Sequence, residues 1–204
     1  AIGVVENMKL IPVDKGTKRD AHYLLANLYY EAKKLDKVEE ELLMTLRIDP
    51  DFHEANNFLG YYFAENNKNL DEAIQLINKA LKAQPNNGAY IDSLGWVYYK
   101  KAQAEGRDDY LTEALKKLLE AVQLLEEPDI YEHIGDVHYS LGHWDEAIDV
   151  WRKAQSLYKK MPGNEPQIEN ITTKLERIEK LISTEKTGLK VIANHVDVEN
   201  VVKP

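Results

Sequence analysis

The stretch that decides the fold runs from residue 57 to residue 100 and reads NFLGYYFAENNKNLDEAIQLINKALKAQPNNGAYIDSLGWVYYK. It contains one short pattern twice: a leucine, a glycine, and an aromatic residue three positions after the glycine. The two copies are Leu59–Gly60 with Phe63, and Leu94–Gly95 with Tyr98. They lie 35 residues apart, since 94 minus 59 is 35. A period of this length indicates a repeat architecture, in which each unit packs mainly on its neighbours.

Two further copies flank this stretch, so the pattern occurs four times. The outer pairs are Leu25–Ala26 and Ile134–Gly135, and the successive spacings are 34, 35 and 40 residues. After each pair comes a second apolar pattern of three residues. The first is small or branched, the second is usually bulky and lies four positions later, and the third is small and lies three positions after the second. These sets are Val38/Leu42/Thr45, Ala73/Ile77/Ala80, Ala114/Leu118/Ala121 and Ala147/Trp151/Ala154. Spacings of three and four residues place the apolar side chains on one face of a helix.

This arrangement resembles the tetratricopeptide repeat, whose pattern is L-G-x2-Y…A-x3-F…A…P over about 34 residues. The resemblance covers residues 19–162, and prolines 50, 85, 128 and 162 follow the second patterns. It implies an all-α fold, a right-handed α-solenoid of antiparallel helix hairpins in a single array over residues 1–186. The expected repeats are 19–52, 53–87, 88–127 and 128–163. Small residues at the pair positions let the two helices of a hairpin approach closely.

The third repeat is longer than the others, and the extra residues are placed at 102–109 (AQAEGRDD). This polar insertion is expected to lengthen either a loop or the ends of both helices. Residues 1–18 are interpreted as part of a preceding repeat and a linker, because Ala1, Val5 and Met8 share the spacing of the second helices. Since the chain opens with Ala1, it is expected to be a fragment of a longer protein.

The C-terminal region has two expected parts. Residues 166–185 form a predicted amphipathic helix that caps the array, with an apolar stripe at Ile168, Ile171, Leu175, Ile178 and Leu181/Ile182. Its polar face has similar numbers of acids and bases, which favours capping over binding at a membrane surface. Residues 187–204 (TGLKVIANHVDVENVVKP) are expected to be non-helical. This tail is either disordered, or extended against the chain's own repeats or those of a neighbouring molecule.

Composition and motifs argue against several classes of function. The net charge of −9 disfavours nucleic-acid binding, which needs clustered lysine and arginine. The absence of cysteine excludes disulfides and thiolate metal sites. No apolar run approaches the roughly 20 residues that cross a bilayer. Histidines 133, 138 and 143 are five apart, which on one helix separates them around the axis. Phosphate-loop and hydrolase motifs are missing, so we expect no metal, no cofactor and no catalysis.

The resemblance places the binding residues on the first helix of each hairpin, which lines a concave surface. The residues expected to bind a peptide there are Tyr23, Asn27, Tyr30, Asn57, Tyr61, Asp92, Trp96, Tyr99, Lys100, Glu132, Asp136 and Tyr139. Trp96, Tyr61 and Asn57 are the strongest candidates, and about half of the tyrosines are expected to pack between helices instead. Eight carboxylates fall on the same positions against the one base, Lys100: Asp20, Glu31, Glu54, Glu65, Asp92, Asp129, Glu132 and Asp136.

These residues predict a non-catalytic scaffold that binds a protein segment carrying apolar and basic residues. Some family members hold the C-terminal carboxylate of a partner with a clamp of lysine, arginine and asparagine side chains. This chain has the asparagines, Asn27 and Asn57, but not the basic residues. A partner with an acidic C-terminal tail is therefore not expected. Two alternatives stay open: a self-associating array whose tail docks in a neighbouring chain, and the non-catalytic arm of a larger enzyme. The chain also looks like the C-terminal repeats of large bacterial tetratricopeptide scaffolds, which implies the cell envelope or periplasm, with the cytoplasm as the alternative.

Overall fold

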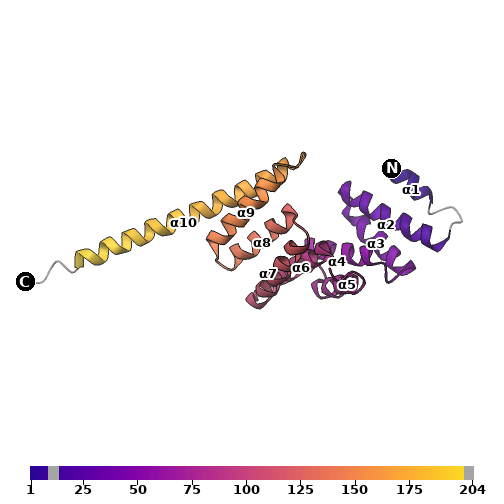
Figure 1. Ribbon diagram of the computed structural model, residues 1–204, viewed down its shortest axis with the longest axis horizontal. Helices are drawn as coiled ribbons and strands as arrows, with labels where there is room; N and C mark the ends of the chain where they lie inside the picture. The colour runs from indigo at the N-terminus through magenta and orange to yellow at the C-terminus, as the bar shows by residue number, and fades with distance from the viewer. Residues whose placement is uncertain (9–13, 200–204) are drawn as a thin grey trace, which may run out of the picture. The chain divides into compact units, whose positions relative to one another are not determined.

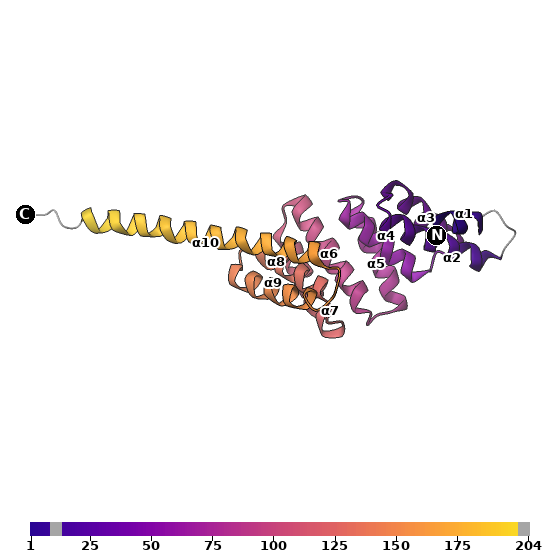
Figure 2. The same cartoon turned by 90° about the horizontal axis from the view of Figure 1, so that it is seen from above.

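The computed structural model describes residues 1–8 and 14–199, and the side chains of Val4, Met8 and 185–199 are outside the description. All regular structure in the described residues is helical (Figures 1 and 2). The helices are α1 (Ile2–Met8), α2 (Lys15–Glu31), α3 (Leu35–Ile48), α4 (His53–Glu65), α5 (Leu70–Ala83), α6 (Gly88–Glu105), α7 (Asp108–Leu124), α8 (Pro128–Ser140), α9 (Trp144–Tyr158) and α10 (Glu165–Glu199). They form two compact units, Ala1–Glu126 and Glu127–Pro204, and each is described by itself.

The helices pair as hairpins: α2 with α3, α4 with α5 and α6 with α7 in the first unit, and α8 with α9 in the second. The expected all-α hairpin fold is therefore confirmed. The residues of each second-helix set, from Val38 to Ala154, are buried in these hairpins. That all four hairpins form one continuous array over residues 1–186 stays a prediction.

The glycines of the repeated pattern lie where two helices touch. A Cβ atom added to Gly60 would lie 2.6 Å from Ile77 Cγ1 and 2.9 Å from the backbone oxygen of Ala73. A Cβ atom on Gly135 would lie 2.3 Å from Cδ1 of Trp151. Real carbon atoms do not approach this closely, so the small residue is required for the helices to pack at this separation. The predicted close approach is confirmed.

The first helix of each hairpin ends in the same left-handed turn. Residues with positive φ follow α2, α4, α6 and α8: Lys33 (55°), Asn67 (49°), Gly106 (64°) and Gly142 (75°). After α2, the amide of Lys33 donates to the carbonyl oxygen of Tyr30 and the amide of Lys34 to that of Tyr29. These bonds satisfy carbonyl groups that the helix end would otherwise leave unpaired, and they are the Schellman motif. The chain can then reverse direction within a few residues.

The longer third repeat is accommodated in its helices. The helices α6 and α7 have 18 and 17 residues, against 13 and 14 for α4 and α5. Only Gly106 and Arg107 separate them. Lys101, near the end of α6, binds Asp71 of α5 at 2.7 Å and Glu105 at 2.6 Å. Of the two expected outcomes, the structure shows longer helices and not a longer loop.

At the start of the chain, α1 packs on α2. Val5 is buried, and the hydroxyl of Tyr29 donates to the carboxylate of Glu6. This hydrogen bond, reinforced by burial, raises the pKa of Tyr29 to about 12. That α1 is the second helix of a preceding repeat stays a prediction.

The helix α10 packs on α9 through Ile171 and Ile178, which are fully buried, as the capping prediction expects. The expectation of a non-helical tail from residue 187 is wrong as far as Glu199, because α10 continues to that residue (Figure 1). A single glycine at 188 costs a helix only about 1 kcal/mol and does not end it. Residues 200–204 are outside the described part. Among the described helices, none has both the length and the apolar content needed to span a bilayer.

Candidate partner-binding face of the first unit

The helices α2, α4 and α6 carry most of the predicted binding residues. We call the following set the acidic–aromatic face: Asp20, Tyr23, Asn27, Tyr30, Glu31, Glu54, Asn57, Tyr61, Glu65, Asp92, Trp96, Tyr99 and Lys100. The set lies within the first unit. Its α8 counterparts, Glu132, Asp136 and Tyr139, belong to the second unit and are described separately.

Aromatic contacts connect α2 to α4. The Tyr23 ring meets Phe52 edge-on at 5.2 Å between centroids, and Tyr30 meets Phe58 edge-on at 5.4 Å. Burial raises the pKa of both tyrosines above the usual value. Tyr30 nevertheless keeps 37% of its surface exposed, so one side of its ring is available to a partner. The prediction that some of these tyrosines pack between helices holds for Tyr23.

The two predicted asparagines have different surroundings. The side-chain amide of Asn27 donates to the backbone oxygen of Tyr23 at 2.8 Å, one turn earlier in the same helix. The Oδ1 atom of Asn57 is buried and accepts no hydrogen bond from any described residue. One turn before it, the Oε2 atom of Glu54 is also buried and lies 3.2 Å from Nδ1 of His53. Two acceptor oxygens on one side of α4 therefore have few donors.

Trp96 connects α6 to α4. Its indole N–H donates to Oε1 of Glu65 at 2.5 Å, and its ring stacks on Tyr99 with 4.9 Å between centroids. The ammonium of Lys100 lies 4.9 Å from the centre of the Trp96 ring, a distance at which the ring quadrupole attracts a cation. Only 8% of Trp96 is exposed, whereas Glu65 is exposed.

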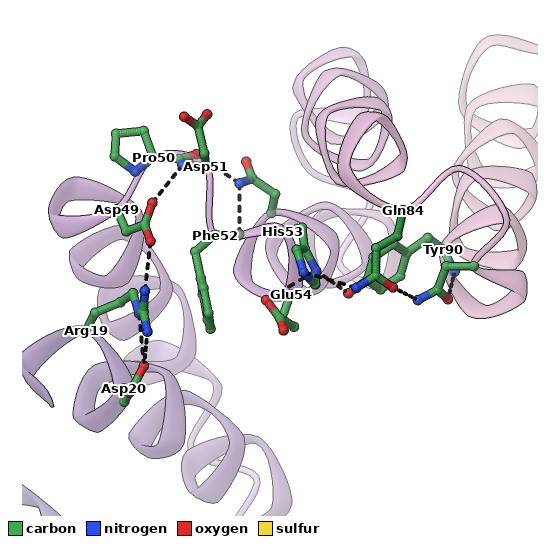
Figure 3. A network of polar contacts seen from close by, with 12 residues as sticks. Arg19, Asp20, Asp49, Pro50, Asp51, Phe52, His53, Glu54, Gln84 and Tyr90 are labelled. Atoms are coloured by element: carbon green, nitrogen blue, oxygen red, sulfur yellow. Dashed lines mark hydrogen bonds and ion pairs between the residues drawn. The ribbon is translucent and has the colours of Figure 1, made fainter. Parts of the chain in front are cut away.

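Polar contacts join residues at the N-terminal ends of α2, α4 and α6 and in the turns that precede α4 and α6 (Figure 3). Arg19 of α2 bonds to Asp49 at 2.9 Å, and its guanidinium lies over the Phe52 ring. His53 of α4 contacts the hydroxyl of Tyr90 on α6 at 2.9 Å and Gln84 at 3.1 Å. Burial raises the pKa of Tyr90 to about 12. These contacts, which the sequence analysis did not single out, connect α2 to the turn before α4 and connect α4 to α6.

In the second unit, the predicted binding residues of α8 contact α10. The ammonium of Lys174 lies 2.7 Å from Oε1 of Glu132 and 2.7 Å from Oδ1 of Asp136. The indole of Trp151 also donates to Asp136, at 3.0 Å, and Tyr139 packs against the Trp151 ring at 5.7 Å. The carboxylates of Glu132 and Asp136 are only 13% and 14% exposed. In this unit Glu132 and Asp136 therefore bind α10.

The titration of this contact shows which force dominates for each group. Burial raises the pKa of Asp136 and outweighs the attraction of Lys174. Burial acting alone would lower the pKa of Lys174, but attraction to Asp136 and Glu132 outweighs it, so that pKa is raised. The sequence held a signal for this contact, because Lys174 lies three residues after Ile171 and four before Ile178, on the helix side that carries the apolar stripe.

Known proteins of one family resemble this chain. A family model described as tetratricopeptide repeat matches residues 39–88, which span α3 to the start of α6. The TPR repeat-containing protein PA4667 of Pseudomonas aeruginosa is 31% identical over 114 residues. Residues 39–88 match the tetratricopeptide-repeat family.

A second curated relative matches a longer part of the chain. MJ1428 of Methanocaldococcus jannaschii, also a TPR repeat-containing protein, is 25% identical over 132 residues. The match with PA4667 covers 56% of this chain and that with MJ1428 covers 65%, but they cover only 19% and 22% of those proteins. The chain thus spans about a fifth of the length of these curated relatives.

Solved structures agree on the fold. TTC0263, a thermophilic TPR protein of Thermus thermophilus, superposes with a TM-score of 0.63 at 19% identity, covering 87% of this chain and 88% of that one. The pilF protein of Pseudomonas aeruginosa superposes with a TM-score of 0.61 at 21% identity, covering 88% and 77%. Tetratricopeptide-repeat proteins are in general non-catalytic scaffolds for other proteins, and the fold of this chain is similar to theirs.

His138 and His143 do not lie on one helix, as the sequence-based argument assumed. The ring of His138 lies 5.7 Å from that of His143, because α8 ends at Ser140 and the chain turns between them. The argument from helical rotation therefore does not apply to this pair. Burial lowers the pKa of His138. Within the described residues, no group of three or more histidine, aspartate or glutamate side chains is arranged to hold a metal ion.

Proposed function

We propose that the acidic–aromatic face of the first unit binds a segment of a partner protein that carries apolar and basic residues. The family and fold support the general role of a scaffold for protein–protein interaction. The observation that carries the specific proposal is the composition of the face: five carboxylates against one lysine, interspersed with aromatic rings. Aromatic residues are enriched among the side chains that dominate binding energy, and a field of one sign steers and selects a partner of the opposite charge.

The available surface lies chiefly at its α2 and α4 parts. The carboxylates of Asp20, Glu31 and Glu65 are exposed, and Tyr30 stands exposed beside Glu31. Asp20 shares its charge with Arg19 at 2.7 Å, which weakens its attraction for a partner. We therefore expect Tyr30 to supply apolar contact and Glu31 and Glu65 to supply charge.

The test compares two variants of the whole chain in capture of partners from lysate of the source organism, with chemical cross-linking and mass spectrometry to locate the contact. The face variant is Tyr30→Ala with Glu31→Lys. The matched control is Leu43→Ala with Glu40→Lys, which makes the same kinds of change on α3, outside the face. Both variants must keep the parent's helix content by circular dichroism.

We expect partners cross-linked to α2, α4 or α6 to be lost from the face variant and retained by the control. Their capture should also weaken as salt is raised, since exposed charges are screened over about 10 Å at 0.1 M salt. If the face variant captures the same partners at the same yield, the partner binds elsewhere and the proposal is wrong.

A further inference from the structure

The chain contains the same set of interacting groups twice, in two different settings. Each set has a tryptophan whose indole N–H donates to a carboxylate, and a lysine whose ammonium lies over the tryptophan ring. In the second unit these are Trp151, Asp136 and Lys174, with 5.6 Å between the ammonium and the ring centre. In the first unit they are Trp96, Glu65 and Lys100, with 4.9 Å.

The two sets differ in where the lysine comes from. Lys174 lies on α10, a separate helix, and reaches the Trp151–Asp136 pair across the surface of α8 and α9. A tryptophan–carboxylate pair in this protein thus binds a lysine brought by a docking helix, with isoleucines three residues before and four after it. Lys100, in contrast, lies four residues after Trp96 on the same helix, and its described contact is with the ring.

We propose that Trp96 and Glu65 form the subsite for a lysine or arginine side chain of the partner, and that Lys100 is a resident cation that the partner's side chain displaces. This inference rests on the proposed function and names one specificity-determining contact within it. The chemistry favours exchange: Lys100 holds the ring face through a cation–π contact, while an incoming cation gains the exposed carboxylate of Glu65 as well.

The proposal makes an unusual prediction for Lys100. On a face that merely attracts bases, removal of its one lysine would change affinity slightly through net charge. If Lys100 occupies the subsite, Lys100→Met removes the cation that competes with the partner's cation for the ring. Binding of a lysine-bearing helix should then tighten by about two- to fivefold, a cation–π contact being worth roughly 0.5–1 kcal/mol at an exposed site. Glu65→Gln should weaken it by a similar factor.

The probe is a capped synthetic peptide of residues 168–182 of this chain, IENITTKLERIEKLI, which carries Lys174 between Ile171 and Ile178 and has equal numbers of acids and bases. A second peptide has glutamine in place of Lys174. Binding to the full chain is measured by fluorescence anisotropy at low salt for the parent, Lys100→Met, Glu65→Gln and a matched control, Glu113→Gln, on the exposed surface of α7.

Support requires three results together: the lysine peptide binds Lys100→Met more tightly than the parent, Glu65→Gln weakens it, and the glutamine peptide is insensitive to both changes. The control should bind like the parent. The inference is overturned if the lysine peptide fails to bind, or if neither Lys100→Met nor Glu65→Gln alters its affinity. Partners lost from the Tyr30 and Glu31 variant but indifferent to Glu65 would leave the proposed function intact and this subsite wrong.

Discussion

Replacement of Gly135 by alanine tests how strictly the helices of a hairpin require a small residue. The added Cβ atom would lie 2.3 Å from Cδ1 and 2.5 Å from Nε1 of Trp151. The indole is rigid, only 2% exposed, and tied by its N–H to Asp136. The ring therefore cannot rotate away within its packing, and the helices must separate or the indole must leave its hydrogen bond.

The expected magnitude follows from three terms. Alanine gains about 1 kcal/mol over glycine in a helix. Overpacking of a close contact costs about 1–3 kcal/mol, and loss of a hydrogen bond to a charged group costs about 1.5–3 kcal/mol. The net loss in the free energy of unfolding is about 1.5–5 kcal/mol. Gly95→Ala should cost about 1 kcal/mol or less, because the neighbour at 2.8 Å is the flexible side chain of Leu118.

The assay is urea unfolding followed by tryptophan fluorescence, since Trp151 lies at the changed contact, and by circular dichroism for the whole chain. Gly3→Ala is the matched control, because its added Cβ atom meets nothing within 4 Å. A Gly135→Ala chain that unfolds at the same urea concentration as this control would show that the hairpin adjusts at little cost, and the packing argument would fail.

Three further predictions concern other contacts. Lys174→Met removes the cation that binds Glu132 and Asp136, so the free energy of unfolding of the second unit should fall by about 2–3 kcal/mol. Amide hydrogen exchange of residues 165–184, measured by mass spectrometry, should become faster. Unchanged exchange would contradict the role of Lys174 in anchoring α10. The pKa of Tyr29 is raised to about 12 from 10.0, so its contribution to stability is complete below pH 10 and is lost as the pH rises towards 12. Tyr29→Phe should make unfolding less dependent on pH over that interval, and an unchanged profile would refute this assignment. Lys33→Gly should stabilise the first hairpin by about 1 kcal/mol in the urea assay, because a lysine there adopts a positive φ; a loss of stability would mean that the gain in chain entropy on unfolding outweighs the relief of strain.

Much of the fold could be predicted because the same pattern of small and apolar residues occurs in each of the four repeats. The small residues at Ala26, Gly60, Gly95 and Gly135 each predicted a close helix contact, and each is buried in one. The spacing of these pairs also gave the order of the hairpins. Local chemistry, repeated at a fixed period, is enough to indicate such a fold.

The candidate site was less predictable because it depends on contacts between distant residues. Lys174 binds Asp136, which lies 38 residues earlier in the sequence. No local sequence pattern predicts which carboxylate a lysine on α10 will bind. The prediction placed Asp136 and Glu132 on a partner-binding surface, but α10 binds them. His138 and His143 approach because the chain turns at the end of α8, which a single-helix interpretation of the interval missed.

The error in the tail has a related cause. Residues 187–199 contain several valines and one glycine, a composition that lowers helix propensity, yet α10 continues through them. Propensity differences of well under 1 kcal/mol per residue do not end a helix that is already nucleated. The prediction placed a helix over residues 166–185 but ended it there, whereas those residues form the helix from which α10 continues to Glu199.

The third hairpin shows how a repeat of this kind changes length. Compared with α4 and α5, α6 gains 18 − 13 = 5 residues and α7 gains 17 − 14 = 3, while the connection between them shortens. The added residues lie at the two ends that meet in the turn. Leu94 lies six residues after the first residue of α6, just as Leu59 lies six residues after the first residue of α4. Ala121 lies three residues before the last residue of α7, just as Ala80 lies three residues before the last residue of α5. The register of the packed faces is therefore independent of the number of residues added at these ends. Each added residue only moves the turn about 1.5 Å farther along the helix axis, so a hairpin of this kind can be lengthened at its turn without repacking.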